Sequence, residues 1–148
     1  MPPIRVAIKR LPHAAGLPLP QYQTLGAAGV DLLAAVAEPA TIAPGARALI
    51  PTGLTIAVPP GYEAQVRMRS GLALRHGLIL PNAPGTIDSD YRGEIQLIVA
   101  NLGAESFVVR RGDRLAQLIL APVARLEWDE RDELPPTDRG DGGFGHTG

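Results

Sequence analysis

Turn-forming residues recur at short intervals along most of this chain, and that spacing is what most limits its possible folds. Pro-Gly, Asn-x-Gly and similar clusters stand at 44–45, 51–53, 59–61, 84–85, 101–103 and 111–113. Between them lie short runs rich in Val, Ile, Leu and Thr, at 4–9, 46–50, 54–58, 63–68, 94–100, 106–109 and 114–120. Many short strands separated by turns are typical of an all-β sandwich or barrel. The helical candidate is 71–76, about one and a half turns.

Length and composition predict one soluble domain. A chain of 148 residues can bury a core without staples, and the absence of cysteine excludes a disulfide scaffold, a thiol nucleophile and a thiolate zinc site. No apolar run approaches the roughly 18 residues of a membrane span, and the first residues show no signal pattern. We therefore expect a cytoplasmic protein. The net charge of −1 gives no basic field that would attract nucleic acid.

The chain changes character near its C-terminal end. It becomes acidic and proline-rich from Glu127, and half of residues 139–148 are glycine. We predict a β-barrel domain at 1–128 and a flexible linker with a Gly-rich arm at 129–148. A disordered tail is the plain reading of such a segment. Its glycines can also wrap amides around a phosphate, Arg139 adds a charged fork, and Phe144 offers a stacking face.

The segment Arg69-Ser70-Gly71 stands where a strand is expected to end and the short helix to begin. Ser70 is a natural N-cap, and a helix N-terminus presents free amides with partial positive charge. With Arg69 beside it, the segment can bind an anion. Ordinary capping and a surface arginine explain the same residues equally well.

Residues 82–93 read as a hairpin or tight loop rich in polar groups. Asn82 offers both an acceptor and donors, as reading the edge of a pyrimidine requires. Asp88 and Asp90 are expected to share one face of a strand, where a carboxylate can orient and deprotonate a water. A paired-carboxylate metal site and two solvated turn acids are the alternatives. Tyr91 is either a core aromatic or a wall against a sugar.

Two polar residues interrupt apolar stretches: Gln117 in 115–120, and Asp31 in 28–33. A buried amide or acid needs hydrogen-bond partners, so each is either a satisfied structural residue or a ligand-facing one. His13 and His76 lie in loop-like contexts without metal spacing, which gives no zinc site.

Taken in order, five stretches resemble the five motifs of the trimeric deoxyuridine triphosphatases (dUTPases): 28–32, 69–73, 82–93, 111–117 and 139–148. The resemblance runs from about residue 27 to the C-terminus. It implies a jelly-roll-like β fold and a homotrimer whose active sites lie between subunits, each completed by a neighbour's glycine arm. It also implies hydrolysis of dUTP to dUMP and pyrophosphate with Mg²⁺ on the triphosphate.

The resemblance also assigns roles to individual residues. Asp88 and Gln117 are the catalytic positions that it implies: Asp88 matches the acid that positions the attacking water, and Gln117 matches a water or phosphate contact. Asp31 matches an outer-shell acid near the metal. The substrate-binding positions that it implies are Arg69, Ser70, Gly71, Asn82, Thr86, Ile87, Tyr91, Arg139, Phe144, Gly145 and His146. Within that set Asn82 reads uracil, Tyr91 rejects a ribose 2′-hydroxyl, and Arg139 and Phe144 clamp phosphate and cover uracil.

One position departs from the family pattern, because His146 stands where a serine is usual. A small hydroxyl donor is exchanged for an imidazole, which can still donate. The nearest rival is a dCTP deaminase of the same fold, but residues 96–100 lack the glutamate that deaminases carry there. The two Arg-Gly-Asp triplets, at 111–113 and 139–141, allow an adhesion module. A nucleotide-binding protein without catalysis is the remaining alternative.

Overall fold

The protein is described by a computed structural model that covers residues 2–147. Its regular elements are, in chain order, β1 (Ala7–Arg10), the 3₁₀ helix η1 (Pro12–Ala14), β2 (Val30–Leu33), β3 (Ala40–Ile42), β4 (Arg47–Pro51), β5 (Leu54–Ala57), β6 (Tyr62–Met68), α1 (Ser70–His76), β7 (Leu78–Ile79), β8 (Gly85–Ile87), β9 (Gln96–Asn101), β10 (Phe107–Val109) and β11 (Arg114–Pro122). Strands dominate, as the turn spacing predicts. No helix in the described range is long and apolar enough to cross a membrane.

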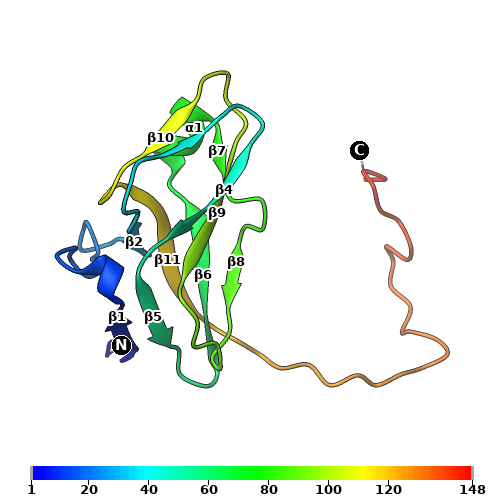
Figure 1. Cartoon of the computed structure of the whole chain (residues 1–148). Helices are drawn as coiled ribbons and strands as arrows, with labels where there is room; N and C mark the ends of the chain where they lie inside the picture. The colour runs from blue at the N-terminus through cyan, green and yellow to red at the C-terminus, as the bar shows by residue number, and fades with distance from the viewer. Residues whose placement is uncertain (1, 148) are drawn as a thin grey trace.

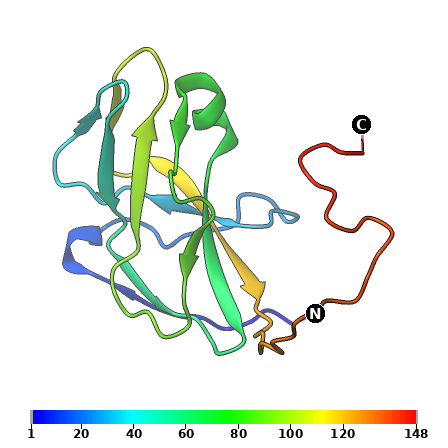
Figure 2. The same ribbon diagram turned by 90° about the vertical axis from the view of Figure 1, so that its right-hand side faces the viewer.

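Four antiparallel sheets build the body (Figure 1). The largest has the order β2-β11-β6-β8, and a three-stranded sheet has the order β4-β9-β7. The other two are the pairs β1-β5 and β10-β3. The view in Figure 2 shows β4 and β9 in one layer and β6, β8 and β11 in another. Most neighbours in the sheets are not consecutive in the chain, which gives the jelly-roll-like, all-β fold that the sequence predicts.

The core lies between these layers and follows from the alternation of the strands. Val66 and Ala64 of β6 face inward, as do Leu97 and Val99 of β9, and all four are buried. Because successive side chains point to opposite faces, the intervening residues of β6 point away from the core. Those residues are polar, and they give the four-stranded sheet a polar outer face.

The C-terminal segment leaves this body. The backbone hydrogen bond from Val123 N to Gly61 O, 2.9 Å long, ties down the end of β11. Beyond it, residues 124–147, called the arm here, run away from the sheets (Figure 1). Nearly all of the arm is exposed.

The expected strands at 46–50, 54–58, 63–68, 94–100, 106–109 and 114–120 correspond to β4, β5, β6, β9, β10 and β11 with small changes of boundary. The N-terminal strand begins at Ala7 rather than residue 4, because its partner β5 pairs only with Ala7–Arg10. Neither β2, β3, β7 and β8 nor η1 was predicted. These elements are two to four residues long, too short for a periodic signal.

Two local expectations are wrong. The cap of α1 is Arg69, which is extended and donates its N–H to Leu115 O, so the helix begins at Ser70 itself. Asp88 and Asp90 do not share a strand face, because β8 ends at Ile87 and a turn follows, with Tyr91 N donating to Asp88 O at 3.2 Å.

Candidate active site

Asp31 lies at the centre of a charged group at one end of the four-stranded sheet. Its Oδ2 is 3.3 Å from Arg114 Nη1 and 3.8 Å from Arg69 Nε. Its side chain is only 5% exposed, so the carboxylate needs these partners. Arg69 also donates from Nη1 to Arg114 O at 3.1 Å, and Gln23 Oε1 accepts from Arg114 Nη1 at 3.0 Å. These contacts hold two guanidinium groups side by side.

Gln117 belongs to the same group through strand register. Its Cα pairs with that of Asp31 on β2 and with that of Arg67 on β6. Directly opposite residues project from the same face of a sheet, so these three side chains share the polar outer face. We call Asp31, Arg69, Arg114 and Gln117 the arginine cluster. Its two arginines and one amide, around a single carboxylate, form a site for an anion.

A second site, the Tyr91 pocket, lies where β8 and the start of β9 meet β6. Its cavity of about 130 Å³ is lined by Val66, Leu80, Asn82, Gly85, Thr86, Ile87, Tyr91, Glu94, Ile95, Gln96, Leu97 and Ile98. Four predicted substrate-binding residues therefore meet here: Asn82, Thr86, Ile87 and Tyr91. A cavity this small can hold a base, but drug-sized ligands occupy about 300–1,000 Å³.

Tyr91 closes one side of this pocket. Its hydroxyl donates to Glu94 O at 2.9 Å, which folds the ring back over Gly93. A Cβ on Gly93 would lie 2.4 Å from the Tyr91 hydroxyl, so only glycine leaves room for the ring there. Tyr91 is thus a wall residue rather than a core aromatic, since it remains 44% exposed.

Asp88 stands apart from both groups. It lies in the exposed turn after β8 and borders a separate cavity of about 440 Å³, together with Glu63, Asp90 and Arg125. It is three residues from Tyr91 in the chain, and the hydrogen bond from Tyr91 N to Asp88 O fixes that spacing. The exposed carboxylate is available to a ligand that spans the outside of the Tyr91 pocket.

Within residues 2–147, the hydrogen bonds of the predicted arm residues are to other residues of the arm. Arg139 Nε donates to Gly142 O at 2.8 Å, and His146 N donates to Gly143 O at 3.1 Å. Phe144 is fully exposed and has a positive φ of 52°, while the following Gly145 has a φ of 83°. The arm therefore exposes an aromatic ring and an arginine, and over the described residues it runs away from the sheets of its own chain (Figure 1).

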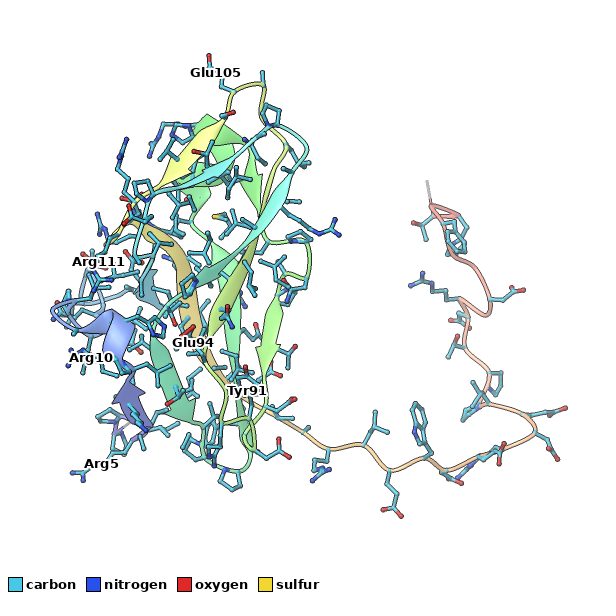
Figure 3. The ribbon with its side chains drawn as sticks, viewed as in Figure 1. Arg5, Arg10, Tyr91, Glu94, Glu105 and Arg111 are labelled. Atoms are coloured by element: carbon cyan, nitrogen blue, oxygen red, sulfur yellow. The ribbon has the colours of Figure 1, made fainter. Side chains whose placement is uncertain are left out.

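One chain does not bring the predicted site together. The arginine cluster is built from β2, β11 and the N-cap of α1, whereas Tyr91 and Glu94 lie in the lower half of the body in Figure 3. The residues that line the Tyr91 pocket do not include any member of the arginine cluster. Ser70 and Gly71 open α1 beside Arg69. The predicted residues thus form four separate groups: the arginine cluster with the start of α1, the Tyr91 pocket, the turn of Asp88 and the arm.

Sequence reasoning missed several residues at these sites. Arg114 forms an ion pair with Asp31, and it lies inside the motif stretch 111–117 without a predicted role of its own. Glu94 and His13 form a side-chain hydrogen bond at the Tyr91 pocket, and they are 81 positions apart in the chain. A signal for Arg114 exists in the sequence, because it lies in the same motif stretch as the predicted site residue Gln117. The pair of His13 and Glu94 had none, since no local pattern joins segments so distant.

The residues fit a magnesium ion that arrives with phosphate rather than one held by the protein alone. Residues 2–147 contain no group of three or more His, Asp or Glu side chains placed to hold a metal. Mg²⁺ commonly keeps several waters and binds through one or two carboxylates plus substrate phosphates. Both ion pairs of Asp31 described above use Oδ2, which leaves Oδ1 free of those arginines for a metal-bound water. The donor set therefore fits an outer-shell role.

Comparison with known proteins gives one answer. A family model described as dUTPase matches residues 15–148. The deoxyuridine 5′-triphosphate nucleotidohydrolase of Methylocella silvestris is 58% identical over 148 residues, covering 99% of this chain and 92% of that protein.

Solved structures agree on the fold. A mutant of the Staphylococcus bacteriophage 80alpha dUTPase with dUpNHpp has a TM-score of 0.85 at 22% identity, covering 97% of this chain and 98% of that one. A mutant dUTPase from phage phi11 of S. aureus, described with a structural Mg(II) ion, has a TM-score of 0.77 at 22% identity, covering 88% and 98%. The match of the family model over nearly the whole chain, together with the identity to the Methylocella protein, shows that this chain belongs to the dUTPase family.

Proposed function

We propose that the protein hydrolyses dUTP to dUMP and pyrophosphate, which limits uracil incorporation into DNA and supplies dUMP. The observation that carries the proposal is the Tyr91 pocket, which gathers a small cavity, the amide of Asn82 and the ring of Tyr91. A pyrimidine fits that space, and family membership names the nucleotide. The two arginines of the arginine cluster support binding of a triphosphate, and family membership supports its hydrolysis.

In this pocket Asn82 reads the uracil edge, and the strand of Thr86 and Ile87 supports the base. Ile87 is buried while Thr86 and Asn82 are exposed, so the strand offers one apolar and one polar side. Cytosine would leave polar groups of the pocket unpaired, which discriminates by orders of magnitude. Tyr91 lies against the deoxyribose and excludes a 2′-hydroxyl by its position.

Arg69, Ser70, Gly71 and Gln117 bind the triphosphate. A triphosphate carries about four negative charges, and paired guanidinium groups bind phosphate oxygens in a bidentate manner. Bound Mg²⁺ would neutralise part of this charge between the phosphates, with Asp31 holding one of its waters. The chain's net charge of −1 makes such local placement of arginine necessary.

Asp88 acts on the attacking water. The water oxygen forms a bond to the α-phosphorus while Asp88 accepts its proton, and the bond from that phosphorus to the bridging oxygen breaks. Pyrophosphate leaves with the bridging oxygen, so charge and atoms balance. This reaction needs alignment and charge stabilisation more than covalent catalysis.

The separation of cluster, pocket and arm supports a homotrimer as the working form. A triphosphate bound at the cluster of one subunit would place its base in the Tyr91 pocket of a second, under the arm of a third. The exposure of Phe144 and Arg139 supports this, because the arm runs away from the sheets of its own chain and can reach a neighbouring subunit. An arm that closes over bound nucleotide would exclude water and position Arg139, Phe144, Gly145 and His146 on it.

Product analysis tests the proposal. The protein is incubated separately with dUTP, dCTP, dTTP and UTP in Mg²⁺, and nucleotides, pyrophosphate and ammonia are quantified. We expect dUMP and pyrophosphate from dUTP alone. Ammonia from dCTP would favour the deaminase, which the absence of glutamate from β9 opposes. If none of the four nucleotides is turned over, the protein is a nucleotide-binding protein without catalysis.

Asp88→Asn separates binding from chemistry. Losing a general base lowers kcat by about 10²–10⁴-fold. The amide keeps the size of the side chain, so dUTP binding measured by calorimetry should persist. Near-full activity of this variant would show that another group activates the water.

A further inference from the structure

The Tyr91 ring lies over Gly93, and one hydrogen bond holds its hydroxyl. The side chain is 44% exposed, and its hydroxyl donates to the main-chain oxygen of Glu94 at 2.9 Å. An exposed ring has several rotamers of similar energy, so this bond selects among them. The placement of the Glu94 carbonyl therefore sets the wall of the Tyr91 pocket.

Glu94 is held in turn by a residue from the other end of the chain. Its carboxylate Oε1 accepts a hydrogen bond from His13 Nε2. The Glu94 side chain is only 14% exposed, whereas that of His13 is 41% exposed. The carboxylate is thus directed inward, at the edge of the pocket that it lines, and His13 covers it.

The His13 segment is itself fixed. Arg111 donates from Nη1 to His13 O at 2.7 Å and from Nη2 to Ala15 O at 2.9 Å, and it lies next to η1 in Figure 3. Leu11 N donates to Gly53 O at 2.7 Å, and Ala14 packs so closely on Gly53 that a Cβ there would be 2.3 Å from its own. The short helix η1 is therefore a firm support and not a loose loop.

We propose that His13 is a positioning residue for substrate selection: through Glu94 it fixes the Tyr91 ring against the sugar of the bound nucleotide. The inference rests on the proposed function, because it assigns the sugar-facing role to Tyr91. His13 touches no reacting atom. Its contribution is to hold one pocket wall, so its loss acts on binding and sugar choice rather than on the chemical step.

If the contact between His13 and Glu94 were purely structural, the kinetic pattern would differ. Removing it would lower stability and leave the kinetic constants of the folded enzyme unchanged. Positioning instead predicts a split between KM and kcat, together with weaker discrimination between dUTP and UTP. Restoration by a side chain that still donates a hydrogen bond is expected only if the contact itself matters.

The experiment uses the full chain with Mg²⁺ and compares His13→Ala, His13→Gln and the double variant His13→Ala/Glu94→Ala. For His13→Ala we expect KM for dUTP to rise about three- to tenfold, the range of one hydrogen bond, with kcat within about twofold. The ratio of kcat/KM for dUTP over UTP should fall by a similar factor. His13→Gln should recover most of the loss, and the double variant should resemble His13→Ala because both break one contact.

Arg10→Ala is the matched control, since it removes another exposed charged side chain just before η1. Melting temperatures of all variants show that the compared proteins are folded. If the wild type is active and folded His13→Ala keeps the same KM for dUTP and the same dUTP-to-UTP ratio, this inference is overturned and the proposed function is not affected. Equal loss in Arg10→Ala would overturn this inference as well. A wild type that does not hydrolyse dUTP would remove the proposed function and this inference together.

Discussion

Gly29 is a position where one added methyl group is expected to separate two strands of the candidate site. It immediately precedes β2 and lies against β11. A Cβ there would be 2.9 Å from Ile119 Cγ1 and 2.9 Å from Leu118 O. The second contact is with main chain, which cannot rotate away. Gly29→Ala must therefore push β2 outward by about 0.5 Å, the difference between 2.9 Å and an ordinary contact of 3.4 Å.

The effect on stability follows from overpacking. Inserting a methylene-sized group into a packed interior destabilises by about 1–3 kcal/mol. For a domain of about 150 residues, each kcal/mol lowers Tm by about 2–4 °C, so a loss of about 2 kcal/mol lowers it by about 4–8 °C. Strand β2 should still form, since its register with β11 continues through Val30 and Leu118.

The effect on activity follows from Asp31, two residues further along. Its Oδ2 lies 3.3 Å from Arg114 Nη1, so a strand displacement of about 0.5 Å disturbs the arginine cluster. A misplacement of about 1 Å can lower a rate about 10²-fold, and half that shift corresponds to about tenfold in kcat/KM. The loss should fall on kcat/KM for dUTP while the dUTP-to-UTP ratio stays constant, because the Tyr91 pocket is remote.

Gly26→Ala is the matched control, because a Cβ at Gly26 meets nothing within 4 Å and its φ is ordinary. Thermal melts at one protein concentration and steady-state kinetics are measured for both variants. We expect Gly26→Ala to match the wild type within about 0.5 kcal/mol. Equal Tm values for the two variants would refute the steric argument at Gly29.

Three further outcomes follow. Asn101→Ala removes three hydrogen bonds of a fully buried side chain, to Ile42 O, Glu105 O and Gly103 N. Denaturant unfolding should show that the free energy of unfolding falls by about 3 kcal/mol, and a fall below about 1 kcal/mol would contradict this expectation. Deleting residues 130–148 should leave Tm within a few degrees but abolish most dUTP turnover, and retained turnover would remove the arm from the site. His146→Ser should change KM for dUTP by less than about tenfold, the scale of one modest hydrogen bond, and a collapse of kcat would show a larger role.

Local pattern was enough to predict the fold class and most long strands. Segment β6 alternates in polarity, β9 is a short apolar run, and turn residues border both, so these signals are encoded within a few neighbouring positions. The family motifs likewise named Asn82, Thr86, Ile87 and Tyr91, which the structure gathers in one pocket. Short elements were missed because β7 has only two residues, too few to show a period.

The sequence by itself thus determined an all-β chain, its turns and the identity of its motifs, because period and turn chemistry are local properties. Tertiary structure decided the contacts. Asp31 meets Arg114 across 83 positions, and Glu94 meets His13 across 81. Asp88 lies in a turn rather than a strand, because the pairing of β8 with β6 ends at Ile87. Arg69 caps α1, because its N–H donates to Leu115 O of β11 and keeps it extended. Register among non-consecutive strands is set by packing of the whole body, and no short window of sequence contains it.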